Sequence, residues 1–146
     1  MLNELNELFK RDINRFIEHI EAMPEGRLWE APPGVTNSAG ILAQHIAGNL
    51  QHYVGKVLAG TGYQRDRDRE FTNTALTKAD LVEGLKQAKA VLDDVLPSLD
   101  TVELDDAFPE LQHFGYTKRE FLFHLYGHLS YHLGQLNYMS RFLDAV

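Results

Sequence analysis

The sequence contains no cysteine, no long apolar run and no cluster of basic residues. Without cysteine, the chain can form no disulfide, no thiolate metal site and no cysteine nucleophile. No segment approaches the roughly 20 apolar residues of a membrane-spanning helix. The opening stretch MLNELNELFKRDINRF alternates charge with leucine and lacks the apolar segment of a signal peptide. We therefore expect a soluble, cytoplasmic protein with no membrane partner.

The charge balance is acidic, with 21 Asp and Glu against 14 Lys and Arg and a formal net charge of −7. A nucleic-acid-binding protein needs a face of Lys and Arg that neutralises phosphates. Because no such cluster occurs, we expect no nucleic-acid partner.

Helical periodicity dominates the chain. Its 146 residues are enough for one domain with its own apolar core, so we predict a single domain over residues 1–146. Apolar residues recur at three- and four-residue steps in four segments, whereas no segment alternates like a strand. The predicted helices span 2–23, 38–59, 77–97 and 117–143. This pattern predicts an all-α four-helix bundle, whose topology the long connections leave open.

The ends of these helices carry recognisable signals. Thr77 with Asp80, and Thr117 with Glu120, have the spacing of a capping box. The residues at 36–38 can cap the second helix, and glycines or prolines follow the first three helices. The connections 24–37, 60–77 and 98–116 are predicted as irregular.

Polar side chains interrupt the apolar face predicted for the last helix. Alternating four- and three-residue steps from its start give the seam Phe121, Leu125, His128, His132, Gln135, Met139 and Phe142. Buried polar groups without partners cost about 1–3 kcal/mol each. The polar centre of this seam must therefore either be satisfied internally, as hydrogen-bonded core histidines, or bind a ligand.

Histidine spacing in the stretch HLYGHLSYHLGQ is typical of a metal site. His124, His128 and His132 follow one another at intervals of four residues, which places neighbours on one helical face. Two imidazoles so placed can share one ion, and a third ligand from a facing helix leaves a coordination position open, as in catalytic sites. We predict His45, His128 and His132 as the ligands of a divalent metal. Imidazole suits several metals, and we expect zinc or nickel first, with iron or manganese as alternatives.

Other polar residues are candidates for the surroundings of this site. His52 follows His45 by seven residues on the same predicted face, about 10.5 Å along the helix axis, so one ion cannot bind both. His52 is therefore a candidate catalytic or pocket residue. His124 and Asp12 are further candidates for the same roles. Asp12 can instead pair with Arg11 or Arg15.

Candidates for substrate binding are Arg65, Arg67 and Gln135. Arg65 and Arg67 belong to the run RDRDRE, in which an arginine can hold a substrate carboxylate. The alternative for this run is a solvated loop of salt bridges.

Two stretches resemble the DinB-like (DinB/YfiT) superfamily of small four-helix metalloproteins. They are NSAGILAQHIAGN in the second predicted helix and HLSYHLGQ in the last, and the Trp29 to Pro32 loop supports them. The loop GTGYQRDRDREF resembles one uncharacterised branch. The resemblance covers nearly the whole chain and implies a divalent metal on one histidine of the second helix and two of the last. Here those residues are His45, His128 and His132, and the resemblance also implies a homodimer.

The resemblance also carries functional expectations. Relatives include transferases and isomerases that use low-molecular-weight thiols, and some metal-dependent hydrolases. It implies a small-molecule substrate and a thiol cofactor, so we place a thiol-dependent S-transferase acting on small electrophiles first. A metal-dependent hydrolase, or a non-catalytic stress-response or interaction module with a structural or vestigial metal, are the alternatives.

One departure from the family pattern affects these expectations. Many relatives read His-Glu-x-His-His-Arg-Gly-Gln where this chain reads HLSYHLGQ, so the glutamate, the adjacent histidine and the arginine are absent. An acid–base role for that glutamate therefore does not carry over to this chain.

Overall fold

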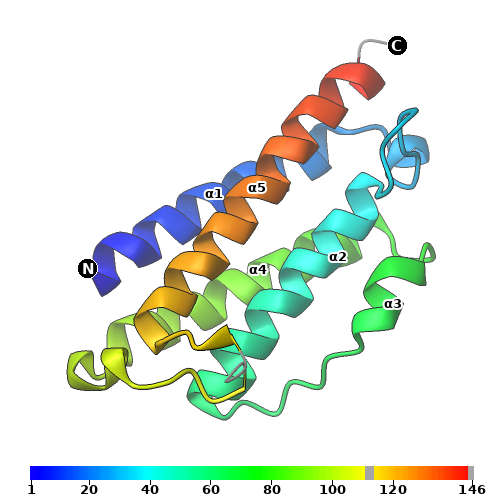
Figure 1. Cartoon of the computed structure of the whole chain (residues 1–146). Helices are drawn as coiled ribbons and strands as arrows, with labels where there is room; N and C mark the ends of the chain where they lie inside the picture. The colour runs from blue at the N-terminus through cyan, green and yellow to red at the C-terminus, as the bar shows by residue number, and fades with distance from the viewer. Residues whose placement is uncertain (111–113, 145–146) are drawn as a thin grey trace.

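Four long helices form an all-α bundle in the computed structural model, which describes residues 1–110 and 114–144 (Figure 1). They are α1 (Leu2–Ala22), α2 (Ala39–Leu50), α4 (Lys78–Val95) and α5 (Lys118–Asp144). Both α1 and α2 pack against α4 and α5, which places α1 and α2 at opposite corners of the bundle. Helices that follow one another in the chain are therefore not all neighbours in space.

Shorter elements connect these helices. α2 continues without interruption into the π-helix η2 (Gln51–Leu58), and the short helix α3 (Arg67–Thr72) lies beside α2. The 3₁₀ turns are η1 (Glu25–Arg27), η3 (Leu96–Ser98) and η4 (Thr101–Asp105). Ala107 and Thr117 form an isolated bridge, and the described ranges contain no β-strand.

The predicted helix ranges agree with the structure to within a few residues, and the predicted caps are confirmed. Thr77 and Asp80 form a reciprocal capping box at the start of α4. Thr117 and Glu120 do the same for α5, with hydrogen bonds of 2.8 and 3.1 Å. Ser38 caps α2 by accepting a hydrogen bond from the Ile41 amide.

The connection predicted as irregular over 60–77 contains α3, which the sequence reading missed. With six residues, α3 is too short for a helical period to stand out. Asp66 caps it by accepting a hydrogen bond from the Arg69 amide. This short helix proves important because it delivers the buried Glu70 to His45 on α2.

The predicted seam of α5 is wrong at Gln135 and Phe142, although Met139 between them is buried as predicted. Gln135 is exposed and Phe142 is 65% exposed, whereas Leu129, Leu136 and Leu143 are buried. Heptad stepping drifts by about 20° per seven residues on a straight α-helix, or about 60° over the three heptads from Phe121 to Phe142. His128 and His132 therefore flank the apolar core instead of occupying its centre.

None of the helices within residues 1–110 and 114–144 combines the length and apolarity that crossing a bilayer demands.

Candidate metal centre

Three histidines from two helices meet between α2 and α5. One ring nitrogen from each of His45, His128 and His132 lies within 4.8 Å of the others. The Nε2 atom of His128 is 3.1 Å from Nε2 of His45 and 3.1 Å from Nε2 of His132. His45 is buried, and the other two rings are half-buried. The structure thus brings together the three residues that the sequence predicted as ligands.

Hydrogen bonds orient two of these rings. His45 Nδ1 lies 3.1 Å from Oε1 of Glu70, and His132 Nδ1 lies 2.7 Å from Oε1 of Gln135. Carboxylate and amide oxygens accept hydrogen bonds, so each Nδ1 carries the proton. The Nε2 atoms of His45 and His132 therefore point unprotonated lone pairs toward the third histidine.

The third ring cannot satisfy both neighbours. A neutral His128 with its proton on Nε2 can aim that proton at only one of the two lone pairs. Its Nδ1 atom is buried and has no hydrogen-bond partner among the described residues. Burial, reinforced by His132 and His45, lowers the pKa of His128 to about 3, and burial also lowers the pKa of His132. Neutral imidazoles with converging lone pairs are the form that binds a metal cation, so these residues fit a divalent ion.

Comparison with known protein families assigns the chain to one of them. The model of the family described as "Protein of unknown function (DUF1572)" matches residues 1–145. The chain belongs to this DUF1572 family. DUF1572 has a DinB-like fold, so the resemblance noted in the sequence is confirmed at that level. No curated protein gives a significant match.

A solved structure shows the same fold as this DUF1572 chain. It is described as the crystal structure of the conserved protein of locus from Enterococcus faecalis. The match has a TM-score of 0.78 at 18% sequence identity and covers 100% of this chain and 98% of the other. The four-helix arrangement is therefore shared, and the likeness speaks for the fold alone.

Glu70 is a residue of the candidate site that the sequence did not predict in this DUF1572 chain. It lies on α3, is buried, and accepts hydrogen bonds of 2.9 Å from Nε and 2.9 Å from Nη2 of Arg65. Although burial raises the pKa of Glu70, hydrogen bonds from His45 and Arg65 outweigh this effect and hold the pKa below its usual value. Glu70 is thus an ionised carboxylate that fixes the tautomer and orientation of His45.

Gly48 allows this carboxylate to approach α2. A Cβ atom at position 48 would collide with Oε2 of Glu70. Glycine is therefore required where α3 delivers its acid to α2. The acidic residue within a charged run, with this glycine three positions after His45, was the only sequence signal for Glu70.

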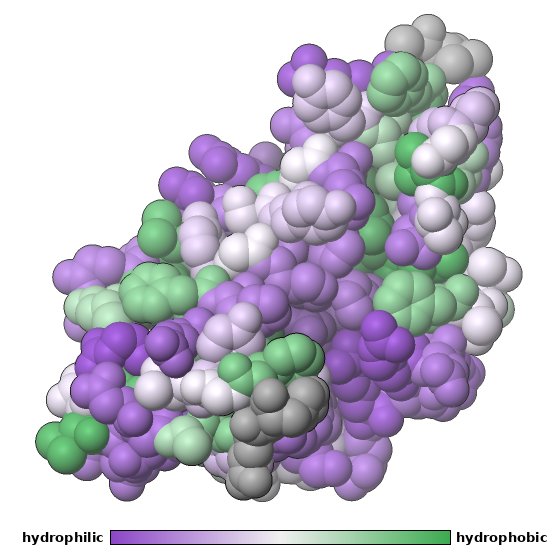
Figure 2. All heavy atoms as spheres, in the orientation of Figure 1, coloured by the Kyte–Doolittle hydropathy of each residue, from purple (hydrophilic) through white to green (hydrophobic). Residues whose placement is uncertain are grey.

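A hollow of about 220 Å³ opens beside the histidines. α2 and η2 line it with His45, Asn49 and Tyr53, and α5 lines it with Phe121, His124 and His128. The surface between α5 and α3 is largely hydrophilic in Figure 2. The candidate His124 is exposed and stacks on Phe121 and Tyr116 with ring centroids 5.4 and 5.5 Å apart. It is therefore available at the hollow for proton transfer.

The two candidate arginines also line this hollow but differ in their contacts. Arg65 is committed to Glu70, and its side chain is 9% exposed. Arg67 is exposed, and its guanidinium lies 5.2 Å from the ring centroid of Phe71. Arg67 forms no ion pair with any residue in the described ranges, so its charge is the one left for a ligand.

His52 and Asp12 are not brought to the three histidines. His52 Nε2 lies 2.7 Å from Oε1 of Glu110. The helix changes from α to π at Gln51, and Tyr53, not His52, lines the hollow beside His45. Asp12, 2% exposed, accepts hydrogen bonds from Arg11 and from Tyr126 on α5. Asp12 therefore ties α1 to α5.

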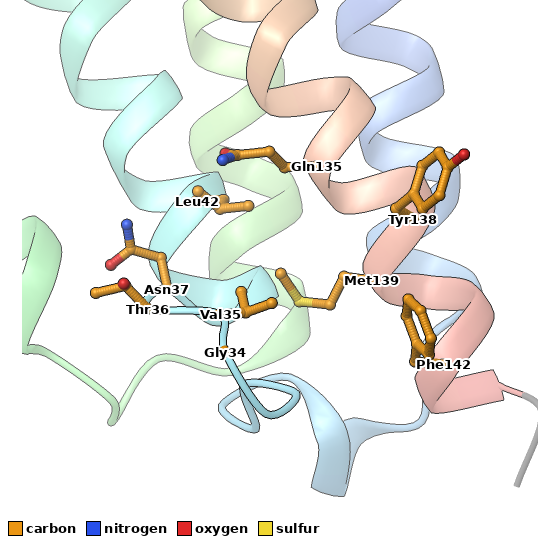
Figure 3. A pocket seen from close by; sticks show the side chains of 9 residues that line it. All are labelled: Gly34, Val35, Thr36, Asn37, Leu42, Gln135, Tyr138, Met139 and Phe142. Carbon is orange, nitrogen blue, oxygen red and sulfur yellow. The ribbon is translucent and has the colours of Figure 1, made fainter.

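Gln135, the third candidate for substrate binding, lies between the histidines and a second hollow. Besides holding His132, it lines a hollow of about 450 Å³ that includes Leu42 and Met139. Figure 3 shows its amide extending from α5 toward α2. Through this hydrogen bond, Gln135 orients the ring of His132, one of the three predicted metal ligands.

Proposed function

We propose that this protein binds a divalent metal through His45, His128 and His132 and uses it in chemistry on a small molecule. The observation that carries the proposal is the pair of Nε2 lone pairs, fixed by Glu70 and Gln135, that converge on His128 at 3.1 Å. Without a cation, only one of the two lone pairs can accept the proton of His128 Nε2, so the other faces no donor. With a cation, all three nitrogens are satisfied.

Two of the three histidines, His45 and His128, line the hollow. A divalent ion held by three imidazoles activates a water or thiol by lowering its pKa toward neutrality. Glu70 keeps the proton of His45 on Nδ1, because its carboxylate remains ionised by pairing with Arg65. His124 lines the same hollow and can exchange a proton with a reacting group.

A thiol-dependent S-transferase acting on small electrophiles is the activity we propose first. Because the chain has no cysteine, the thiol must be a separate low-molecular-weight molecule. Zinc or nickel is the favoured metal, with iron or manganese as alternatives, since imidazole binds all of these. We also propose that the loop at 60–68 marks a branch of the family, because it supplies Arg65 to Glu70.

Elemental analysis of protein purified without chelators or a histidine tag tests the metal site. We expect near-stoichiometric metal in the wild type and in the control His52→Ala, and loss of metal in His128→Ala. A metal-free wild type that also fails to bind added zinc and nickel would overturn the proposal.

The activity is tested by incubating metal-loaded protein with a small electrophile in the presence and absence of a low-molecular-weight thiol. We expect thiol conjugation that is abolished by chelation and by His128→Ala. Turnover that does not need the thiol would indicate a hydrolase instead. A firmly bound metal with no turnover in either assay would indicate a structural site.

A further inference from the structure

The hollow beside the three histidines contains a polar side chain that no contact within the protein explains. Asn49 lies one helical turn after His45 on α2, is 8% exposed and lines the hollow. Its amide oxygen is buried without a hydrogen-bond partner among the described residues. Leaving a buried amide oxygen without a partner costs stability. A ligand that hydrogen-bonds to Asn49 would remove this cost, since rotation of the amide presents either its oxygen or its nitrogen to the hollow.

The charges around the hollow favour an anion. No acidic residue lines it within the described ranges. The adjacent carboxylate of Glu70 is neutralised by the bidentate contact with Arg65. Arg67, which forms no ion pair within the described ranges, contributes a positive charge to the lining. A metal cation on the histidines would add to this positive potential.

The size and the remaining lining limit the ligand further. About 220 Å³ corresponds to about seven waters at roughly 30 Å³ each, which is enough space for a small molecule. Tyr53, Phe121 and Leu125 supply apolar surface on the walls. The preferred occupant therefore has a compact apolar body as well as polar groups.

We propose that this hollow binds small carboxylic acids that also carry a hydroxyl or amine group. Arg67 binds the carboxylate, Asn49 hydrogen-bonds to the second polar group, and the aromatic walls contact the apolar body. The inference rests on the proposed function in taking this hollow as the substrate site, and it names the class of substrate.

Three matched probes test the proposal by calorimetric titration of the metal-loaded protein. They are 3-phenyllactate, 3-phenylpropionate, which lacks the hydroxyl, and 3-phenyllactamide, which lacks the negative charge. We expect the wild type to bind 3-phenyllactate at least about fivefold more tightly than either analogue, because each lost hydrogen bond costs about 1 kcal/mol or more.

Variants of Arg67 and Asn49 test which residue causes each of the two binding preferences. Arg67→Gln should remove the preference over the amide, whereas the matched surface variant Arg69→Gln should keep it. Asn49→Leu should remove the preference over 3-phenylpropionate, and Asn49→Ala serves as a second variant if the leucine does not fold. Equal binding of the three probes, no binding, or equal losses in Arg67→Gln and Arg69→Gln would overturn the proposal.

The metal content of each protein separates this inference from the proposed function. Retained metal with absent probe discrimination contradicts the substrate class alone. If the wild type holds no metal, the proposed function fails, and titration of the metal-free protein still decides whether Arg67 and Asn49 discriminate among the probes.

Discussion

Among individual residues, Glu70 is the one that orients His45. Its carboxylate is buried, receives two hydrogen bonds from Arg65, and lies 3.1 Å from His45 Nδ1. A carboxylate behind a ligand histidine fixes the ring and raises its basicity, and removing such a partner typically costs about 10–100-fold in metal affinity.

We therefore predict that Glu70→Gln, which keeps the size of the side chain but removes its charge, weakens zinc affinity by about 10–100-fold. Competition with a coloured zinc chelator measures this affinity. The matched control is Glu110→Gln, which changes an acid paired with His52, outside the three-histidine group. Unchanged affinity in Glu70→Gln would mean that the carboxylate serves only to hold Arg65 and α3.

At the level of secondary-structure elements, Asp12 on α1 and Tyr126 on α5 connect their two helices. The Tyr126 hydroxyl donates a hydrogen bond of 2.9 Å to Asp12, and the Tyr126 ring packs edge-on against Phe9. Arg11 reaches the same pair from α1. This network holds the α5 segment on which His128 lies, without touching the histidines.

Tyr126→Phe should reduce the free energy of unfolding by about 1.5–3 kcal/mol, because it removes the hydroxyl that donates to Asp12 and accepts from Arg11 but keeps the ring packing. Urea denaturation of metal-free protein measures the change, with the exposed Tyr138→Phe as the control. The same variant should retain its metal. Loss of metal in Tyr126→Phe would show that this tie positions His128.

At the level of the whole molecule, the outer face of α5 exposes a row of aromatic side chains. Phe123, Tyr131, Tyr138 and Phe142 are 50%, 64%, 68% and 65% exposed and recur along one face of the helix. Gly127 and Gly134 lie between them, and a Cβ atom at either position would meet no atom within 4 Å. An aromatic face of this kind is typical of a protein-binding surface.

We predict that this face forms the homodimer that the family resemblance implies. Light scattering after size-exclusion chromatography should give twice the chain mass of 16.6 kDa. Tyr138→Glu should shift the protein toward the monomer, because a charge on the face resists burial. Val102→Glu, at a residue 83% exposed on η4, is the control. A monomeric wild type, or equal effects of both variants, would contradict the prediction.

Local rules within the sequence determined the four long helices, their capping boxes and the three histidines that meet. Helical period, caps and an i, i+4 pair depend on residues close together in the chain, so they can be read before the fold is known. Contacts between residues far apart in the sequence could not be predicted from such local patterns. Glu70 appeared as one acid in a charged run, Asn49 as an ordinary helix residue, and Asp12 as a candidate for the site.

Tertiary structure decided those roles, because they depend on which helices become neighbours. α3 packs on α2, and Gly48 leaves room there for Glu70. His52 on the π-helix contacts Glu110, and the approach of α1 to α5 gives Asp12 to Tyr126. Burial lowers the pKa of His128, whereas hydrogen bonds from His45 and Arg65 outweigh burial and lower the pKa of Glu70. Both effects arise only when distant segments of the chain come together.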